Sequence, residues 1–225
     1  MKRVYHAVIF DLDGVLADTV EYHYLATKQV SDKLNIPFDR ELNQRMQGMS
    51  RTVLIEELVR KSDRSYTPLQ KAELGNQKNA NYQQLISRIT KDDILPGMSD
   101  FITTLKKNHM KMAIASASSN AKTVLDNLEI SHYFDHIVDI HDVKKMKPDP
   151  EIFLKAADAL NVPYDKCIAI EDSEAGIKAI KQTPMFSIGV GEHAAVKSAD
   201  WHVHSTEEIS YEKLLTLVSL SPINA

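Results

Sequence analysis

Two aspartates two positions apart end the first apolar run of the chain, in the stretch AVIFDLDG over residues 7–14. Asp11 and Asp13 project to the same side of an extended backbone, and Gly14 allows a tight turn directly after them. Paired carboxylates can hold a cation, attack an electrophile or move a proton. The pattern D-x-D-G also arises by chance in about one chain in twenty of this length. Alone, the pair fits two solvated turn aspartates equally well.

Three further polar segments follow apolar runs. The segment SASSN has small residues whose N–H and hydroxyl groups can surround an anion at a helix start. KPDP begins at Lys147, and EDSEAG begins with Glu171 and Asp172. Each segment also has an ordinary interpretation. In SASSN, Ser119 or Asn120 could simply cap a helix. Lys147 could be a surface lysine, and Glu171 and Asp172 could be acids placed favourably beside a helix N-terminus.

Functional groups in a parallel sheet gather where strands reach its carboxyl edge, so these four segments are expected to meet. Three or four carboxylates at one edge repel each other unless a cation lies among them. Oxygen ligands without paired His or Cys favour a hard ion, and we expect Mg²⁺. With Lys147 and the Ser116 hydroxyl, the site would hold a phosphate between metal, cation and backbone amides. The sequence therefore predicts a phosphoryl-transfer site.

Short apolar runs and amphipathic stretches alternate along most of the chain. The runs are typical of buried strands and cover residues 7–10, 112–115, 136–139, 167–171 and 186–190. The stretches 120–130 and 150–160 carry apolar residues at the three- and four-residue spacing of helices. This alternation predicts an α/β fold with a doubly wound parallel sheet, which is a Rossmann-like core.

One interval breaks the alternation. Residues 18–92 contain no strand-like run but show helical periodicity, clearest in 21–34 and 52–59. An interval of about 75 residues is too long for a loop. We therefore expect two units: an α/β core from residues 1–17 and 93–225, and an inserted all-helical cap domain from residues 18–92.

Composition indicates an ordinary globular protein. The chain has 27 Lys and Arg residues against 31 Asp and Glu residues, and its net charge is −4. It therefore lacks the excess of positive charge that is typical of proteins that bind nucleic acid or an anionic membrane. No segment approaches the roughly 20 apolar residues of a membrane span, and the apolar run near the N-terminus is too short for a signal peptide. The single cysteine, Cys167, lies in an apolar run and fits a reducing compartment. We expect a cytoplasmic monomer.

In chain order, DLDG, SAS, KPDP and EDSEAG resemble the four motifs of the haloacid dehalogenase-like superfamily. The helical insert after the first motif resembles the cap of the phosphoglucomutase-like branch. DLDGVLADTVEYH, GMSR, KNANY, LPG and ASASSN narrow the similarity to the β-phosphoglucomutases. The resemblance implies interconversion of β-D-glucose 1-phosphate and glucose 6-phosphate, through an aspartyl-phosphate and β-glucose 1,6-bisphosphate.

The resemblance also implies roles for residues of the core. Asp11 would be the nucleophile that becomes phosphorylated, and Asp13 would be the general acid and base. Magnesium would be held by Asp11, the Asp13 carbonyl, Asp172 and, directly or through water, Glu171. The transferring phosphoryl group would be held by Ser116, the Ala117 N–H and Lys147.

For the cap, the resemblance implies that Arg51 clamps the phosphate that is not transferred, since a guanidinium binds phosphate bidentately. Lys78 would steady the closed cap, with Thr19 and His23 on the hinge side. Further substrate contacts are implied for Gly48, Ser50, Ser118 and Asn120. Two residues near the expected phosphate or sugar pocket depart from the pattern of relatives: Leu54 replaces a serine and Ser119 replaces a basic residue.

A Mg²⁺-dependent sugar-phosphate phosphatase is the nearest alternative, because hydrolysis needs only water in place of a sugar hydroxyl. A non-catalytic phosphosugar-binding module would require a gap among the catalytic parts, and none is missing. A dehalogenase needs no second acid in the first motif, and a phosphonatase needs a cap lysine for a Schiff base, which the sequence does not identify. The expected partners are small sugar phosphates, with no nucleic acid and no membrane.

Overall fold

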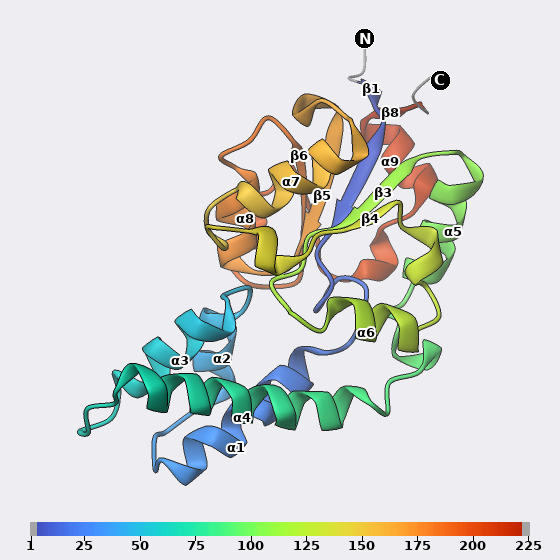
Figure 1. Ribbon diagram of the computed structural model, residues 1–225. Helices are drawn as coiled ribbons and strands as arrows, with labels where there is room; N and C mark the ends of the chain where they lie inside the picture. The colour runs from blue at the N-terminus through green and yellow to red at the C-terminus, as the bar shows by residue number, and fades with distance from the viewer. Residues whose placement is uncertain (1–3, 222–225) are drawn as a thin grey trace.

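The computed structural model describes residues 4–221 and consists of a sheet with helices on both faces and a helical region at one end (Figure 1). The strands are β1 (Val4–Tyr5), β2 (Ala7–Phe10), β3 (Lys111–Ile114), β4 (His136–Ile137), β5 (Cys167–Glu171), β6 (Phe186–Val190), β7 (Trp201–Val203) and β8 (Ser219–Leu220). The α-helices are α1 (Val20–Lys33), α2 (Arg40–Met46), α3 (Arg51–Val59), α4 (Pro68–Ile86), α5 (Met98–Lys107), α6 (Ala121–Asn127), α7 (Glu151–Leu160), α8 (Glu174–Ile180) and α9 (Tyr211–Leu217). Short 3₁₀ helices are η1 (Lys91–Asp93), η2 (Ser131–Tyr133), η3 (Ile140–Asp142), η4 (Tyr164–Lys166), η5 (Val196–Ser198) and η6 (Thr206–Glu208).

The main sheet is parallel, with the strand order β4-β3-β2-β5-β6-β7. The central strand β2 pairs with β3 on one side and β5 on the other, so that Phe10 lies opposite both Ile114 and Ile170. The chain order thus reverses at β2, and ligands of such sheets bind beyond the carboxyl ends of the strands at that reversal. The predicted doubly wound parallel sheet is confirmed.

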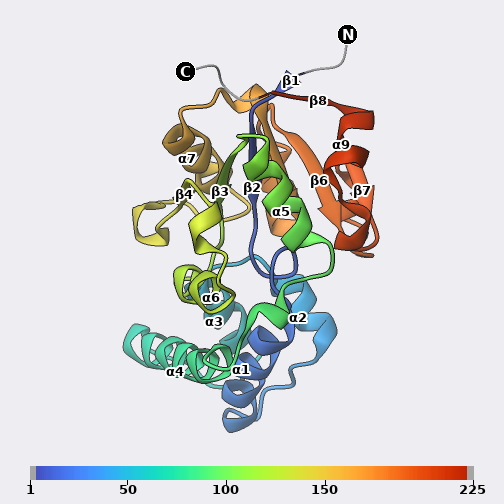
Figure 2. The ribbon, with the colours of Figure 1, turned by 90° about the vertical axis from the view of Figure 1, so that its right-hand side faces the viewer.

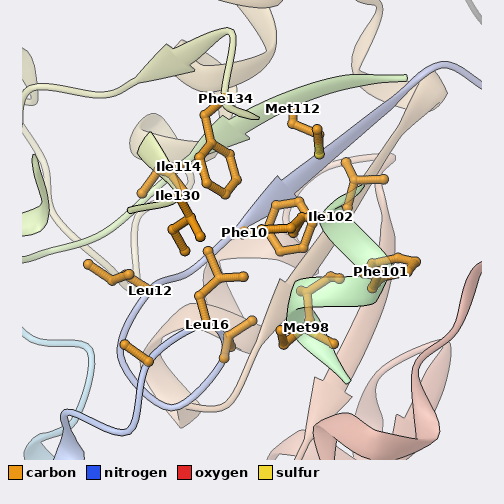
Figure 3. Packing of buried hydrophobic residues seen from close by; sticks show 14 of the residues in the cluster. Phe10, Leu12, Leu16, Met98, Phe101, Ile102, Met112, Ile114, Ile130 and Phe134 are labelled. Atoms are coloured by element: carbon orange, nitrogen blue, oxygen red, sulfur yellow. The ribbon is translucent and has the colours of Figure 1, made fainter. Parts of the chain in front are cut away.

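Alternate residues of β2 serve the two faces of the sheet. Val8 and Phe10 belong to the apolar cluster under α5, α6 and α9, whereas Ala7 and Ile9 belong to the cluster under α7 and α8. Figure 2 shows α5 crossing in front of the sheet, and Figure 3 shows Phe10 inside the first cluster. There the rings of Phe101 and Phe134 approach Phe10 nearly edge-on, at centroid distances of 6.1 and 5.8 Å. A strand buried on both faces is necessarily a continuous apolar run.

The predicted strands at 7–10, 167–171 and 186–190 are confirmed as β2, β5 and β6. The strand expected at 112–115 lies one residue earlier, and the one expected at 136–139 keeps only two residues before the chain turns into η3. The sequence prediction did not include β1, β7 or β8, which are short strands at the edge of the main sheet or in a separate parallel pair.

Helices α1 to α4 lie between β2 and β3 in the chain and form the helical region at the lower end of Figure 1. This region has an apolar cluster of its own, made of Tyr24, Val30, Ile36, Phe38, Leu42, Met46, Leu54, Ile55, Leu58 and Val59. No strand occurs between residues 18 and 92, as expected. Tyr82 and Ile86 at the end of α4 pack into the cluster of the sheet instead, and the domain boundaries at 18 and 92 stay a prediction.

Two segments join the helical region to the sheet, and they run side by side. The Leu95 N–H donates to the Leu16 carbonyl at 3.0 Å, and the Asp18 N–H donates to the Asp93 carbonyl at 3.0 Å. None of the helices within residues 4–221 is both long enough and apolar enough to cross a bilayer.

Candidate active site

The ammonium group of Lys147 lies between two carboxylates at the carboxyl edge of the sheet. Asp11 follows β2 and Glu171 ends the neighbouring strand β5. Nζ of Lys147 is 2.8 Å from Oε2 of Glu171 and also pairs with Oδ1 of Asp11. The Lys147 side chain is 0% exposed, so the surface-lysine interpretation is wrong. Burial alone lowers the pKa of Lys147, but the two carboxylates raise it above its ordinary value, and the lysine carries a charge.

The second oxygen of Glu171 organises the start of α8. Oε1 accepts hydrogen bonds from the Asp172 N–H at 3.1 Å, the Ser173 N–H at 2.9 Å and the Ser173 hydroxyl at 2.8 Å. Oγ of Ser173 accepts from the Gly176 N–H at 3.0 Å and thereby caps α8. A Cβ on Gly176 would lie 1.8 Å from Oε2 of Glu171. Only glycine lets the helix begin this close to the buried carboxylate.

Three carboxylates form a compact oxygen cluster. Asp11, Glu171 and Asp172 each present an oxygen within 4.8 Å of the other two. Burial is the main cause that raises the pKa of Asp11, and the charge of Glu171 raises it further. Lys147 opposes both, and the resulting pKa is about 8. Burial also raises the pKa of Asp172 well above its ordinary value. A divalent cation would stabilise the ionised form of such crowded acids.

The cluster fits a metal ion. Oδ1 of Asp172 is buried and has no hydrogen-bond partner among the described residues. Oδ2 of Asp172 accepts a hydrogen bond from the side-chain amide of Gln47. An orphaned carboxylate oxygen beside two others, with no sulfur or imidazole in the group, is the donor set of a hard cation.

The carboxylate of Asp13 does not join this cluster. Its Oδ1 accepts from the Thr19 hydroxyl and, at 3.2 Å, from the Tyr82 hydroxyl, and it lies 3.2 Å from Nε2 of His23. Burial alone would raise the pKa of Asp13, but His23 and these hydrogen bonds lower it to about 2. Both aspartates line the same cavity, as the sequence predicted, but the carboxylate of Asp13 meets side chains of α1 and α4 instead of the cluster. A role for the Asp13 carbonyl as a metal ligand stays a prediction.

Lys78 determines which nitrogen of His23 carries the proton. Nζ of Lys78 lies 3.2 Å from Nδ1 of His23. Because an ammonium can only donate, Nδ1 accepts and the ring proton lies on Nε2, which faces Asp13. Burial and, more weakly, Lys78 lower the pKa of His23, although Asp13 opposes them. The neutral ring also stacks on Tyr82, with centroids 4.0 Å apart.

A cavity of about 310 Å³ separates the helical region from the carboxyl edge of the sheet. The predicted residues that line it are Asp11, Asp13, His23, Gly48, Ser50, Arg51, Leu54, Lys78, Ala117, Ser118, Ser119, Asn120 and Asp172. Thr19, Ser116, Lys147 and Glu171 lie behind this lining, all buried. The cavity also has residues that the sequence did not indicate, namely Asn43, Gln47, Asn79, Tyr82 and His141.

Two cations face this cavity without an acidic partner. Within residues 4–221, neither Arg51 nor Lys78 forms an ion pair with a carboxylate. Arg51 begins α3, and its side chain passes beside Gly75 of α4, where a Cβ would lie in ordinary contact, 3.7 Å from Cγ of Arg51. Burial lowers the pKa of Lys78 to about 8 against the opposing effect of Asp13, with a smaller lowering by Arg51. The pair supplies positive charge for an anion in the same cavity that the acid cluster lines.

The loop after β3 meets helix α4. Ser116 is buried, and its hydroxyl accepts from the Ser118 N–H at 3.1 Å. Asn120 occupies the N-cap position of α6, but its side chain makes no capping bond. It bonds instead to Asn79 at 3.0 Å and to Gln83 at 3.2 Å, both on α4. The helix-capping interpretation of the Asn120 side chain is therefore wrong.

The loop between α2 and α3 also reaches the sheet. Besides the hydrogen bond from Gln47 to Asp172, Gly48 takes a φ of +77°, and a Cβ there would lie 2.4 Å from Oγ of Ser173. Glycine is required for this approach. The sequence signal for the α4 contacts is the set of polar residues at 78, 79 and 83 of that helix.

Comparison with known proteins gives consistent similarities. A family model described as haloacid dehalogenase-like hydrolase matches residues 5–183. The β-phosphoglucomutase of Bacillus subtilis is 45% identical over 210 residues, which covers 92% of this chain and 93% of that protein. A phosphorylated carbohydrates phosphatase of Thermotoga maritima is 31% identical over 184 residues, covering 78% and 80%. The crystal structure of a β-phosphoglucomutase from Clostridium difficile aligns with a TM-score of 0.90 at 40% identity, covering 94% of this chain and 96% of that one.

Proposed function

Since the chain belongs to the haloacid dehalogenase-like hydrolase family, we propose that it interconverts β-D-glucose 1-phosphate and glucose 6-phosphate. The observation that carries this proposal is the cavity, which holds an acid cluster on one wall and the unpaired cations Arg51 and Lys78 on another. A sugar bisphosphate has one phosphate for each wall. The predicted superfamily is confirmed by the family model and by both β-phosphoglucomutase relatives.

Asp11 acts as the nucleophile. Lys147 pairs with its Oδ1, and Oδ2 makes no hydrogen bond within residues 4–221, so Oδ2 is the atom that attacks phosphorus. The attack forms an aspartyl-phosphate and releases the sugar hydroxyl. Asp11, Asp172, Glu171 and the Asp13 carbonyl would hold a Mg²⁺ ion, which would supply positive charge to balance the phosphoryl oxygens. Ser116, the Ala117 N–H and Lys147 hold the same oxygens.

Asp13 moves the proton. With a pKa of about 2, it is a carboxylate at neutral pH and can accept a proton from the attacking sugar hydroxyl. Thr19, His23 and Tyr82 all meet Oδ1, so Oδ2 is the oxygen that takes the proton and returns it to the leaving oxygen. His23 and Tyr82 belong to α1 and α4, and the helical region therefore orients the base.

Arg51 clamps the phosphate that is not transferred, assisted by Ser118 and Asn120. Gly48 and Ser50 lie beside the sugar, and Lys78 links that end of the cavity to His23. We infer that residues 18–92 act as a cap domain that positions these groups over the acid cluster. Cytoplasmic location and a monomeric state stay predictions, and size-exclusion chromatography tests the second.

A sugar-phosphate phosphatase is the second candidate function. The observation that favours it is the similarity to the Thermotoga maritima phosphatase at 31% identity. Hydrolysis would use the same Asp11 and Asp13, with water as the attacking group. The mutase is preferred because Arg51 and Lys78 supply a second anion site.

Product analysis separates the two functions. The protein is given β-D-glucose 1-phosphate with Mg²⁺ and a trace of β-glucose 1,6-bisphosphate, and glucose 6-phosphate and inorganic phosphate are measured together. We expect glucose 6-phosphate to form much faster than phosphate, with the α anomer a poor substrate. Phosphate release that equals or exceeds glucose 6-phosphate formation at saturating sugar would identify a phosphatase.

A further inference from the structure

Asn120 is held by two side chains of helix α4 rather than by its own helix. We propose that Gln83 and Asn79 are positioning residues that set the orientation of the Asn120 carboxamide in the second phosphate site. The inference rests on the proposed function, in which Asn120 meets the phosphate that is not transferred. Neither the sequence motifs nor the resemblance assigned a role to these two residues.

The three amides form a chain of side-chain hydrogen bonds. Nε2 of Gln83 donates to Oδ1 of Asn120 at 3.2 Å, and Nδ2 of Asn120 donates to Oδ1 of Asn79 at 3.0 Å. Asn120 is 7% exposed, so the protein rather than bulk water orients its amide. The bonds join α4 to the start of α6, which lies directly above it in Figure 1.

The chain of hydrogen bonds has a direction. Gln83 presents a donor, so the oxygen of Asn120 turns toward Gln83 and its NH₂ group turns toward Asn79. An amide NH₂ has two donor hydrogens. Asn79 accepts one of them, and the second stays available to a phosphate oxygen in the cavity that Asn79 and Asn120 both line. A reversed carboxamide would present its oxygen to the anion and repel it.

The same face of α4 also serves the base. Residues 78 and 82 are four positions apart, as are 79 and 83, and 79 and 82 are three apart, which are the spacings that bring helix side chains together. Lys78 and Tyr82 contact His23 and Asp13, and Asn79 and Gln83 contact Asn120. One helix face therefore aligns the second phosphate site with the carboxylate that moves protons. Gln83 lies outside the cavity lining and acts only through Asn120.

The first test removes the donor of residue 83. Gln83→Met has nearly the same length as glutamine but cannot donate. Gln84→Met is the matched control, because Gln84 is exposed like Gln83 but its side chain makes no hydrogen bond within residues 4–221. For the loss of one hydrogen bond, we expect Gln83→Met to raise KM for β-D-glucose 1-phosphate about three- to tenfold, with kcat nearly unchanged. Gln84→Met should match the wild type, and neither change should move the thermal midpoint.

The second test reverses the amide. Glutamate at position 83 only accepts, so Gln83→Glu forces the NH₂ group of Asn120 away from the cavity. Gln84→Glu places the same charge one residue away. We expect KM to rise further in Gln83→Glu than in either Gln83→Met or Gln84→Glu. Phosphorylation of Asp11 by acetyl phosphate, which has no second phosphate, should keep its wild-type rate in all four variants.

Two results would overturn the inference: a wild-type KM in Gln83→Met, or equal KM values in Gln83→Glu and Gln84→Glu. Failure of the proposed function has a different signature, because the wild type itself would then form no glucose 6-phosphate. Calorimetric binding of glucose 6-phosphate gives a readout that does not need turnover. Gln83→Met should weaken that binding by the same factor, and equal affinity in the wild type and Gln83→Met contradicts the positioning role.

Discussion

The ring of His23 stacks on the ring of Tyr82 at a centroid distance of 4.0 Å, and both side chains meet the same oxygen of Asp13. His23 belongs to α1 and Tyr82 to α4, the first and last α-helices of the inserted region. A change in how these helices pack therefore changes the orientation of the base. Lys78 extends this contact into the cavity through Nδ1 of His23.

Substrate affinity should depend on the charge of Lys78. Burial lowers the pKa of Lys78 to about 8, so the free protein loses a positive charge in the cavity as the pH rises through that value. We expect KM for the sugar phosphate to rise above about pH 8, measured in a pH series of initial rates. Lys78→Met should have a KM about 10- to 150-fold higher, the range for a hydrogen bond to a charged group, without this rise. Lys71 lies on the same helix as Lys78 and pairs with Glu56 of α3. Lys71→Met should keep the wild-type pH dependence.

Asp11→Asn should stop all turnover, because an amide cannot attack phosphorus. The fold should persist, since asparagine has nearly the same volume and Lys147 keeps Glu171 as a partner. Intact-mass spectrometry after treatment with acetyl phosphate checks this: the wild type gains a phosphoryl group and the variant does not. Substantial mutase activity in Asp11→Asn would exclude the covalent mechanism.

Removal of divalent cations should abolish turnover, and Mg²⁺ should restore it, since Asp11, Glu171 and Asp172 are crowded within 4.8 Å. Mg²⁺ affinity, measured by calorimetry, should fall strongly in Asp172→Ala. Asp126→Ala is the control, because Asp126 forms an exposed pair with Lys122. Full activity in excess EDTA contradicts the metal assignment.

Arg51→Ala should impair the mutase reaction selectively. Hydrogen bonds from a charged group contribute about 1.5–3 kcal/mol, so kcat/KM for β-D-glucose 1-phosphate should fall about 10- to 150-fold. Phosphorylation by acetyl phosphate should hardly change. Arg45→Ala, which removes an exposed pair with Glu41, should leave both rates unchanged because such pairs contribute about 0–1 kcal/mol. Equal losses on both substrates would remove Arg51 from the second phosphate site.

The thiol of Cys167 should be inert in the folded protein. The side chain is fully buried in β5, and burial raises its pKa to about 12. Since the thiolate is the reactive form, iodoacetamide at pH 8 should label Cys167 only after addition of denaturant. Mass spectrometry measures the labelled fraction, and rapid labelling of the native protein would contradict this burial.

The sequence predicted the central strands well because they are buried on both faces. β2, β5 and β6 are continuous apolar runs, whereas the edge strand β7 carries His202 at its centre and gave no such run. Helix α4 gave no clear periodicity although it is long. Its buried face consists of Gly75, Lys78, Tyr82 and Ile86, and two of these four are not apolar.

The acid cluster was predictable because successive strand ends of a parallel sheet meet at one edge. The hydrogen-bond partners of Asp13 were not predictable, because they are side chains of α1 and α4 that lie far from Asp13 in the sequence. The partners of Asn120 were missed for the same reason. Contacts between α4 and the loop after β3 join residues about 40 positions apart and have no local pattern.

The place of the helical region in the chain has a consequence for folding. The central strand β2 pairs with residues as far along the chain as Lys111 and Cys167, so the sheet needs long loops to close before its first strand has neighbours. Helices α1 to α4 are local in sequence and have an apolar cluster of their own. During synthesis these helices can therefore pack together before β3 and β5, the strands that pair with β2, have been made. We expect assembly to proceed from the inserted helices to the sheet.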